Sequence, residues 1–550
     1  MSSVQQSPSK SSAAAQYDAI IIGAGVTGLY QLYRLRELGL RVRVIEAADG
    51  VGGTWYWNRY PGARFDSESY SYGYSFSKEL LQEWDWTEHF SPQPETLRYL
   101  NFVADKFDLR KDIQFNSRVR AATFDETANC WVIETAAGER ASARFLITAL
   151  GPLSAPMMPN IAGIDSFEGP SFHTFNWPAD PDGFGGQDVG YAGKRVGVIG
   201  TGATGVQVIQ ELAKMAGHLT VFQRRPNWCT PLGNRLVDAE TQAKIKANYP
   251  EIFKKCRESF AAMVHDFDPR SALDVSAEER EALFEKLYAG PGFTLWLGAF
   301  ADVLTNQKAN DLLSDFVSRK IRQRVKDPRV ADMLVPKDHG FGTRRVPLET
   351  EYYEVYNQPN VTLVDIKATP MERITPKGVQ TSDREYELDM IIYATGFDAV
   401  TGALTRIDIQ GEGGRKLKDK WADGPRTYLG LQSAGFPNLF TLVGPQGNSA
   451  LCNIPRCAEL NVEWVTDMIR YMRTNKLVRA EPRKDAEDAW VRHVTEVAGA
   501  TLLPKTDSWY TGANVPGKKH TFLIYAGGNV AYREKLAEVA TNDYEGFAFL

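Results

Sequence analysis

The segment YDAIIIGAGVTGLYQLYRL, residues 17–35, decides the fold of this chain. A short apolar run predicts a strand, the glycines after it predict a tight turn, and a helical pattern follows. Four leucines mark the apolar face of that helix: Leu29, Leu32, Leu35 and Leu38. The segment RVRVIEAA, residues 41–48, predicts the next strand. Strand, turn, helix and strand together make one βαβ unit, the repeating element of parallel α/β folds.

The turn in this unit has the spacing of a dinucleotide-binding loop. Gly23, Gly25 and Gly28 form G-x-G-x-x-G, which allows a tight turn, a close approach to a pyrophosphate and close packing of helix on strand. The helix N-terminus offers free N–H groups to the anion. Glu46 ends the second strand, where a carboxylate binds a ribose 2′-hydroxyl and repels a 2′-phosphate. We therefore expect FAD or NAD here, with a glycine turn that binds nothing as the alternative.

A second unit of the same kind lies over residues 194–223. Its loop, Gly200-Thr201-Gly202-Ala203-Thr204-Gly205, repeats the glycine spacing. Arg224 and Arg225 end its second strand, where the first unit has Glu46. Guanidinium groups pair with phosphate in a bidentate geometry, so this unit is predicted to prefer NADPH. Solvated surface arginines are the alternative.

Composition limits the class of protein. The 550 residues predict three or four structural units, and 43% hydrophobic with 24% charged residues is ordinary for a globular chain. A net charge of −5 argues against nucleic-acid binding by bulk charge, and no apolar run is long enough for a membrane span. Five cysteines without C-x-x-C predict no disulfide framework and suit a reducing compartment, so we expect a cytoplasmic protein.

The predicted fold class is α/β, with two Rossmann-like dinucleotide-binding domains and a helical insertion. A second glycine turn at Gly52 and Gly53, beside aromatic residues, suits a flavin in the first domain. A capping-box start at Ser276 supports the helical insertion. The expected layout is a disordered tail over 1–16, an FAD-binding domain over 17–155 and 391–550, an NADP-binding domain over 156–230 and 339–390, and a helical subdomain over 231–338.

Three further segments carry a resemblance to a known family. Residues 167–178 match F-x-G-x-x-x-H-x-x-x-W-P, residues 53–66 match G-x-W-x-x-x-x-[FY]-P-G-x-x-x-D, and residues 393–398 read YATGFD. The chain resembles the type I Baeyer–Villiger monooxygenases, which depend on FAD and NADPH, and most of all their phenylacetone, steroid and cyclic-ketone branch. The resemblance implies NADPH- and O₂-dependent oxidation of cyclic or aryl/alkyl ketones to esters or lactones through a C4a-peroxyflavin. The expected partners are a small ketone and O₂, and the expected state is a monomer.

The resemblance also implies roles for individual residues. Arg345, in the segment GTRRVP, takes the place of the active-site arginine, and Asp66 orients it. Arg344 replaces a frequent lysine at the 2′-phosphate, and Trp509 resembles the tryptophan of a mobile loop over the nicotinamide. Solvated arginines and an ordinary buried tryptophan are the alternatives. The implied flavin neighbours are Thr54, Trp55, Tyr56, Trp57 and Tyr72, and the implied NADP contacts are Arg64, Thr201, Gly202, Ala203, Thr204, Gly205, Val206 and Gln207.

A further expectation concerns His173, which lies in the first of those matching segments. We interpret His173 as a hydrogen-bonded linker residue between the two nucleotide halves, with a base as the alternative.

Three rival functions are alternatives to the one that the resemblance implies. A flavin monooxygenase of amines or sulfides has a similar fingerprint without the ending Trp177-Pro178, which is present here. A disulfide reductase needs a cysteine pair near the flavin, and Cys452 and Cys457 are spaced C-x₄-C late in the chain. A flavin-binding protein without catalysis is the third rival.

Overall fold

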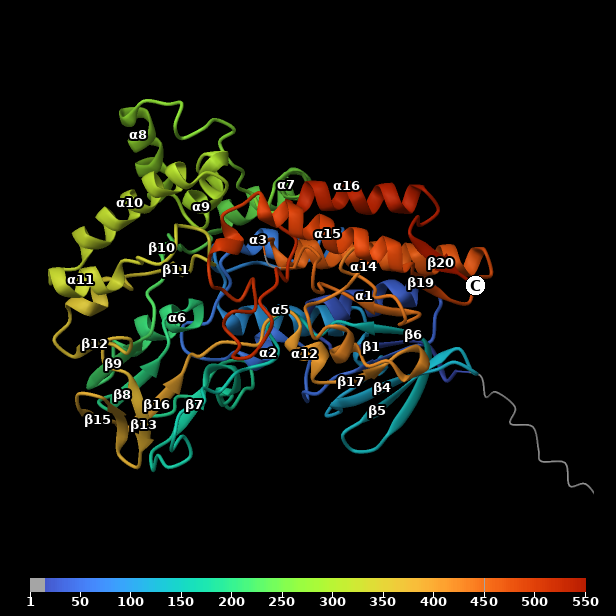
Figure 1. Ribbon diagram of the computed structural model, residues 1–550, viewed down its shortest axis with the longest axis horizontal. Coiled ribbons are helices and arrows are strands. Elements are labelled where there is room, and N and C mark those ends of the chain that lie inside the picture. Colours follow the sequence, from blue (N-terminus) through green and yellow to red (C-terminus); the bar gives the residue numbers. More distant parts are fainter. Residues whose placement is uncertain (1–14, 450) are drawn as a thin grey trace, which may run out of the picture.

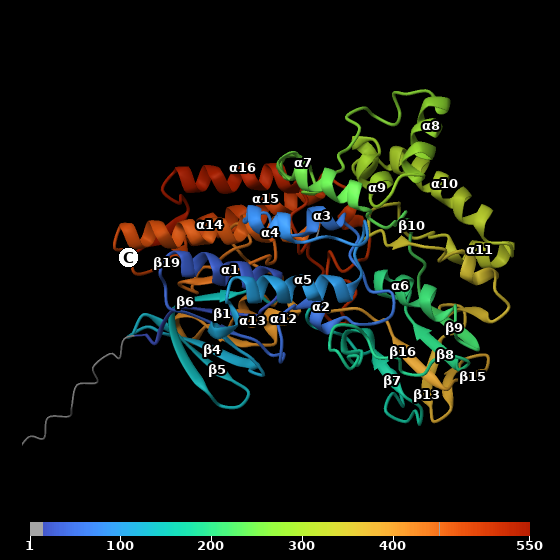
Figure 2. The ribbon, with the colours of Figure 1, turned by 180° about the vertical axis from the view of Figure 1, so that it is seen from behind.

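The computed structural model describes residues 15–449 and 451–550. The tail predicted over residues 1–16 lies outside the described residues, apart from its last two. Two separate sheets lie side by side, and helices cover them (Figure 1). The same arrangement seen from behind shows helices α1 and α5 on the first of these sheets (Figure 2).

The first sheet has eight strands in the order β17-β4-β5-β6-β1-β2-β3, with β18 paired to β6. Its centre is parallel: β1 pairs with both β2 and β6 in parallel register. The strand segment YDAIII is buried along its last four residues, as expected for a strand covered on both faces. The strands are β1 (Tyr17–Ile22), β2 (Val42–Ile45), β3 (Ile113–Gln114), β4 (Val119–Asp125), β5 (Cys130–Thr135), β6 (Arg140–Thr148), β17 (Asp408–Gln410) and β18 (Leu439–Thr441).

The second sheet is parallel throughout, in the order β12-β9-β8-β16-β7. Each glycine loop joins a central strand of its sheet to the following helix, so the two units repeat one design. The predicted α/β class with two such units is confirmed. The strands are β7 (Ser171–His173), β8 (Arg195–Ile199), β9 (His218–Gln223), β12 (Val361–Asp365) and β16 (Met390–Tyr393).

Three small sheets complete the strand structure of the described residues. Strands β13 and β15 flank β14 in an antiparallel sheet beside the second unit, and β10 pairs with β11 in parallel. Strand β19 pairs with the C-terminal strand β20. Their bounds are β10 (Thr230–Pro231), β11 (Leu348–Glu349), β13 (Met371–Thr375), β14 (Gly378–Thr381), β15 (Glu385–Glu387), β19 (Ala480–Pro482) and β20 (Phe547–Phe549).

Helices of the first unit come from both ends of the chain. Helices α14, α15 and α16 run above the first sheet, beside the N-terminal helix α1 (Figure 1). The bounds are α1 (Val26–Glu37), α2 (Thr54–Trp57), α3 (Ser69–Tyr72), α4 (Lys78–Glu83), α5 (Gln93–Lys106), α12 (Gly402–Thr405), α13 (Leu417–Lys420), α14 (Ile454–Thr474), α15 (Lys484–Gly499) and α16 (Gly528–Thr541).

The second unit carries α6 (Ala203–Leu212) after its glycine loop, and a group of helices follows it. Helix α8 begins as the sequence predicts, because the Ser276 hydroxyl accepts the Glu279 N–H at 3.1 Å. The helices of this group are α7 (Ala239–Glu258), α8 (Ala277–Tyr288), α9 (Thr294–Gly298), α10 (Gln307–Arg324) and α11 (Pro328–Leu334).

The chain passes between the two sheets twice, and the two crossings pair with each other. The Met157 N–H donates to the Gly396 carbonyl at 3.0 Å, and the Asp398 N–H donates to the Ala155 carbonyl at 2.8 Å. The Thr395 hydroxyl donates to the Met157 carbonyl at 2.6 Å. The crossings therefore form a short antiparallel ribbon.

The domain layout differs from the sequence prediction at one point. The boundary expected between residues 390 and 391 falls inside β16, whose four residues pair with β8 in the second sheet. The second unit therefore extends to Tyr393, because all four residues of β16 pair within the second sheet. The remaining division into domains stays a prediction.

The cysteines show one local pairing. The sulfur atoms of Cys452 and Cys457, five residues apart, lie within bonding distance of each other. Cys130, Cys229 and Cys256 are buried and free. One pair between near neighbours joins no distant parts of the chain, so it is not a disulfide framework.

Candidate active site between the two glycine loops

An ion pair links the two residues that the sequence predicts for catalysis. Arg345 Nη2 donates to Asp66 Oδ2 at 2.9 Å, and the side chains are 26% and 9% exposed. The guanidinium carbon lies 4.3 Å from the ring centre of Phe293 and 5.6 Å from that of Trp296. These aromatic rings hold a cation by its attraction to their faces and leave part of it accessible.

Burial makes the Asp66 carboxylate unusually easy to protonate. Burial raises the pKa of Asp66 above its ordinary value, while the charges of Arg345 and Arg64 act in the opposite direction. Its second oxygen, Oδ1, is buried and has no hydrogen-bond partner among the described residues. The ion pair with Arg345 therefore depends on pH more strongly than an exposed pair does.

The first glycine loop lies against backbone on two sides. Gly23 has φ of 105°, and a side chain there would come within 2.7 Å of the Ala149 carbonyl oxygen. A side chain at Gly25 would lie 3.3 Å from the Cα atom of Gly53. The two glycine turns thus face each other, which leaves bare backbone at the place where a dinucleotide backbone binds in this fold.

The Glu46 carboxylate holds that loop in place through hydrogen bonds to backbone N–H groups. Its carboxylate is buried and accepts the N–H groups of Ala24 at 2.6 Å and Ala48 at 2.8 Å. Burial raises the pKa of Glu46, and the backbone hydrogen bonds oppose this rise. Each carboxylate oxygen has a further lone pair, so these contacts are compatible with a ribose hydroxyl.

The predicted flavin-side aromatics divide into two groups. Trp55 Nε1 donates to the Tyr72 hydroxyl at 3.0 Å, and Tyr72 stacks on Phe65 with ring centres 4.2 Å apart. Trp57 stacks on Phe175, with ring centres 5.4 Å apart. Trp55 and Trp57 lie on one short helix, α2, which follows the turn at Gly53, and we refer to Trp55, Trp57 and Tyr72 together as the aromatic wall.

The two remaining residues predicted beside the flavin are Tyr56 and Thr54. The Tyr56 hydroxyl donates to Asp49 at 2.5 Å, and Arg59 lies 4.3 Å from the Tyr56 ring centre. Thr54 is exposed at the start of α2. Thr54 contributes no aromatic contact, whereas Tyr56 makes an edge contact with Trp57, with ring centres 5.0 Å apart.

The second glycine loop has open space where the first has a facing turn. Gly200 has φ of 111°, and a side chain at Gly202 would meet no atom within 4 Å. The Thr201 hydroxyl donates to the Arg225 carbonyl at 2.9 Å, which ties the loop to the end of β9. Ala203, Thr204 and Gly205 begin α6 beside this open side.

The other residues of α6 that were predicted to contact NADP make contacts within the protein. Val206 lies in the hydrophobic core. Gln207 accepts the Tyr60 hydroxyl at 2.7 Å and donates to the Arg64 carbonyl at 3.0 Å. The Arg64 guanidinium is itself paired with Glu88 at 3.0 Å. These residues therefore hold α6 to the segment that leads to Asp66.

Arginines from two distant segments meet around one acid. Arg225 Nε lies 3.4 Å and Arg344 Nη2 lies 3.7 Å from Asp338 Oδ2, and Arg225 Nη2 lies 3.5 Å from Asp507. Burial lowers the pKa of Arg344, and the charge of Arg225 acts in the same direction. Arg224 is exposed and forms no ion pair within the described residues. Three arginines, Arg224 included, thus face two carboxylates, so the group carries one surplus positive charge that an anion would balance.

Sequence reasoning missed several residues of this site. Asp338 and His339 precede Arg344 in the run KDHGFGTRR, whose density of charged residues was an available signal. Burial lowers the pKa of His339 to about 4, so its imidazole is neutral at pH 7. Phe293 and Trp296 follow the turn Gly290-Pro291-Gly292, but no local pattern indicates that they flank an arginine.

His173 contacts the crossing segments, as a linker residue would. Its Nδ1 accepts the Phe175 N–H at 3.1 Å, and its ring makes an edge contact with Phe397 at 6.1 Å between centres. Burial lowers the pKa of His173. No nucleophile lies among these contacts.

The loop that carries Trp509 lies along the arginine segment. The Thr506 hydroxyl donates to the Thr343 hydroxyl at 2.9 Å, two residues before Arg345. Trp509 is half-buried, and its ring centre is 4.5 Å from that of Tyr510. The structure thus places this loop beside the segment of Arg344 and Arg345.

Two further features are absent over residues 15–449 and 451–550. None of the helices there combines the length and the apolar character that a membrane crossing requires. No three or more histidine, cysteine, aspartate or glutamate side chains gather there as a metal-binding group.

Comparison with known proteins identifies the family. Residues 17–240 match the family described as flavin-binding monooxygenase-like. The chain is 50% identical to 2-oxo-Delta(3)-4,5,5-trimethylcyclopentenylacetyl-CoA monooxygenase of Pseudomonas putida, over 96% of this chain and 98% of that protein. It is 45% identical to a Baeyer-Villiger monooxygenase of Pseudooceanicola batsensis, over 96% of both chains.

A solved structure agrees with these relatives. The crystal structure of OTEMO in complex with FAD and NADP superposes with a TM-score of 0.95 at 50% identity, over 98% of this chain and 100% of that one. The resemblance stated from the sequence is thereby confirmed. The chain belongs to the flavin-binding monooxygenase family, among its FAD- and NADPH-dependent Baeyer–Villiger monooxygenases, which oxidise ketones.

Proposed function

We propose that this enzyme inserts oxygen beside the carbonyl of a cyclic ketone, and that Arg345 is the catalytic residue. The observation that carries the proposal is the half-buried Arg345 guanidinium, held by Asp66 between two aromatic rings. The redox and oxygen chemistry is supplied by FAD and NADPH when they are bound. The chain's own task is to place the ketone and to stabilise charge on it.

Arg345 suits that task because an arginine side chain stays positively charged at every working pH. Attack on a ketone places negative charge on the carbonyl oxygen. A fixed cation in a water-poor site stabilises this charge without having to reorganise. Asp66 acts as a positioning residue, since one of its oxygens holds Arg345 and limits the guanidinium's movement.

The first unit has the features that FAD binding requires. The loop requires glycine at positions 23 and 25, because a side chain there would meet the backbone of Ala149 or Gly53, and the bare backbone that results would allow a pyrophosphate to approach closely. Glu46 would receive a ribose hydroxyl. The aromatic wall of Trp55, Trp57 and Tyr72 would line the flavin side, together with the more exposed Thr54 and Tyr56.

The second unit has the features that NADPH binding requires. The open side of Gly202 would accept the pyrophosphate, next to Thr201 and the start of α6. Arg225 and Arg344 would bind the 2′-phosphate, because they already converge on one carboxylate and, together with Arg224, outnumber the two acids of the group. Arg224 would add a solvated charge at the rim, and Trp509 would cover the nicotinamide. The contacts of Arg64, Val206 and Gln207 favour a supporting role for these three.

The ketone class follows from the relatives. The Pseudomonas putida relative acts on a cyclopentenyl compound that carries a 2-oxo group and a CoA thioester. Relatives from Comamonas and Acinetobacter are named for cyclopentanone and cyclohexanone, so we propose a five- or six-membered cyclic ketone with O₂ as the co-substrate. The monomeric state and the cytoplasmic location stay predictions from the sequence.

Adjacent arginines provide a matched test. In Arg345→Ala, NADPH should still reduce the flavin, but ester or lactone formation should fall by about 10²–10³-fold, the usual loss when one charge-stabilising group is removed. In Arg344→Ala, the KM for NADPH should rise while the lactone still forms. Product analysis with cyclohexanone and NADPH-dependent bleaching of the flavin measure the two effects. Lactone formation by Arg345→Ala at the wild-type rate would contradict the proposal.

A further inference from the structure

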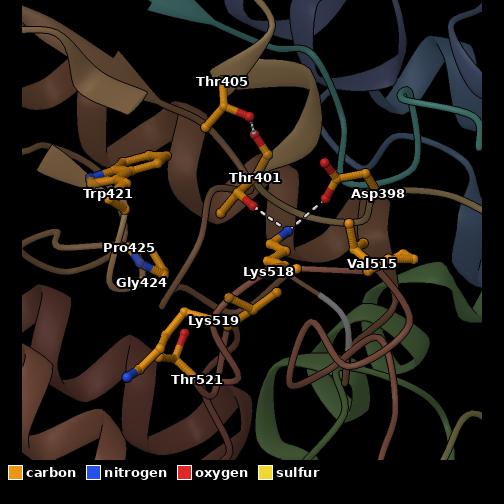
Figure 3. Close-up of a pocket in the computed structure, with 14 residues that line it drawn as sticks. Asp398, Thr401, Thr405, Trp421, Gly424, Pro425, Val515, Lys518, Lys519 and Thr521 are labelled. Carbon is orange, nitrogen blue, oxygen red and sulfur yellow. Dashed lines mark hydrogen bonds and ion pairs between the residues drawn. The ribbon is translucent and has the colours of Figure 1, made fainter. Parts of the chain in front are cut away.

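The loop from Thr506 to Thr521 is attached at both of its ends. At its start, the Thr506 hydroxyl bonds to Thr343, and Asp507 lies 3.5 Å from Arg225. Near its end, Lys518 reaches the segment that follows β16 (Figure 3). The loop therefore spans from the arginine cluster to the crossing between the two sheets.

The Lys518 contact is specific in geometry. Its ammonium donates to Asp398 Oδ1 at 2.6 Å and to the Thr401 hydroxyl at 2.7 Å, and Figure 3 shows it between these two side chains. Lys518 is 19% exposed and Asp398 is 21% exposed, so the pair is screened less than a surface pair. Both residues line a cavity of about 280 Å³ at the foot of the loop, where Asp398 is the one acidic residue.

A second contact joins the loop to the same segment. The Asn514 side chain donates to the Phe397 carbonyl at 2.8 Å. Asp398 also donates its N–H to Ala155, in the ribbon between the two sheets. The end of the loop is therefore fixed to the ribbon, while its start is fixed to residues of the proposed NADPH site.

We propose that Lys518 is a positioning residue that latches this loop over the bound dinucleotide through Asp398 and Thr401. This inference rests on the proposed function, because the covered ligand is the NADPH of that reaction. Loss of the latch frees the end of the loop that follows Trp509. NADP⁺ then leaves early and water enters, so NADPH, O₂ and a proton yield NADP⁺ and hydrogen peroxide in place of lactone.

The neighbouring lysine provides a matched control. Lys519 is exposed and forms no ion pair within the described residues, so Lys519→Met removes the same charge without touching the latch. In Lys518→Met, the fraction of NADPH converted to hydrogen peroxide at saturating ketone should rise severalfold. The KM for NADPH should rise as well, with an unchanged maximal rate of flavin reduction. Lys518→Arg should restore coupling, because it can still pair with Asp398.

Two measurements made without ketone separate this inference from the proposed function. The rate of NADP⁺ release and the rate of limited proteolysis within residues 512–521 should both rise in Lys518→Met and in Asp398→Asn, and stay at wild-type values in Lys519→Met. Retained yellow colour and an unchanged unfolding temperature show that the variants fold. Wild-type release and proteolysis in both Lys518→Met and Asp398→Asn would overturn the latch. A wild-type enzyme that oxidises no ketone would overturn only the proposed function.

Discussion

Single residues decide the chemistry of this site, and Asp66 is the clearest case. Burial raises its pKa, while its ionised form is the one that holds Arg345. As pH falls through that raised pKa, the carboxylate takes a proton and the ion pair is lost. Activity on the acid side therefore depends on a carboxyl group that titrates above the range of an ordinary aspartate.

We predict that Asp66 shifts the acid limb of the pH–rate profile, the range in which activity falls as pH falls, to higher pH. The pH profile of kcat for lactone formation should fall on the acid side at a pH above the usual aspartate range. In Asp66→Asn the limb should disappear, and the rate at pH 8 should drop by about 10²-fold because Arg345 is misplaced. Steady-state rates between pH 5 and 9 measure both effects. The same limb in Asp66→Asn would assign it to another group.

At this scale the sequence identifies residue types more readily than contacts. The glycines of both loops were predictable, because backbone geometry within six residues demands them. The pair of Arg345 and Asp66 joins positions 279 residues apart, so no local pattern contains it. Only the matching family motifs pointed to it. Phe293 and Trp296 had no such motif and were missed.

Single elements follow local rules, and the first turn of α8 is the sharpest example. The Ser276 hydroxyl accepts the Glu279 N–H and satisfies a donor that the helix leaves unpaired. Ser276→Ala should cost this helix end about 1 kcal/mol. Amide hydrogen exchange in residues 277–280 should therefore quicken about fivefold.

A serine inside a neighbouring helix controls for the change in side chain. Ser318 lies within α10, and its hydroxyl donates back to the Ser314 carbonyl at 2.9 Å. Ser318→Ala removes a hydroxyl without removing a cap, so exchange in residues 277–280 should stay at the wild-type rate. Equal exchange in Ser276→Ala and wild type would show that packing, not the cap, holds this turn.

Elements that depend on distant partners were harder to predict. Strand β16 is a short apolar run, MIIY, but no local pattern shows which sheet it joins, because its neighbours β7 and β8 lie more than 190 residues away in the chain. The predicted boundary consequently divided it. Helix α6 was predicted from its glycine loop, whereas its docking through Gln207 onto Tyr60 came only from the structure.

The stability of the whole molecule should depend on pH through His339. Its side chain is fully buried, and its pKa of about 4 in the folded protein lies below the ordinary value of 6.5. The unfolded chain therefore takes up this proton first as pH falls. The stability that the neutral imidazole provides is complete above pH 6.5 and is lost progressively down to about pH 4. The loss amounts to about 3 kcal/mol at most.

Two histidine variants test this dependence. His339→Asn should flatten the fall in unfolding free energy between pH 6.5 and 4, measured by urea denaturation. His520→Asn changes an exposed histidine and should keep the wild-type slope. A slope in His339→Asn equal to that of the wild type would show that other groups cause the acid sensitivity.

The paired crossings have a mechanical consequence for the whole enzyme. The two crossings are joined by hydrogen bonds through Met157, Gly396 and Asp398. A paired ribbon of this kind bends more easily across its flat face than it twists about its long axis. We therefore expect any relative movement of the two halves to be a bending of this ribbon and not a twist about it. The Tyr60–Gln207 hydrogen bond and the Arg345–Asp66 ion pair also join the halves, so the ribbon and these contacts together set the distance between the two dinucleotide loops.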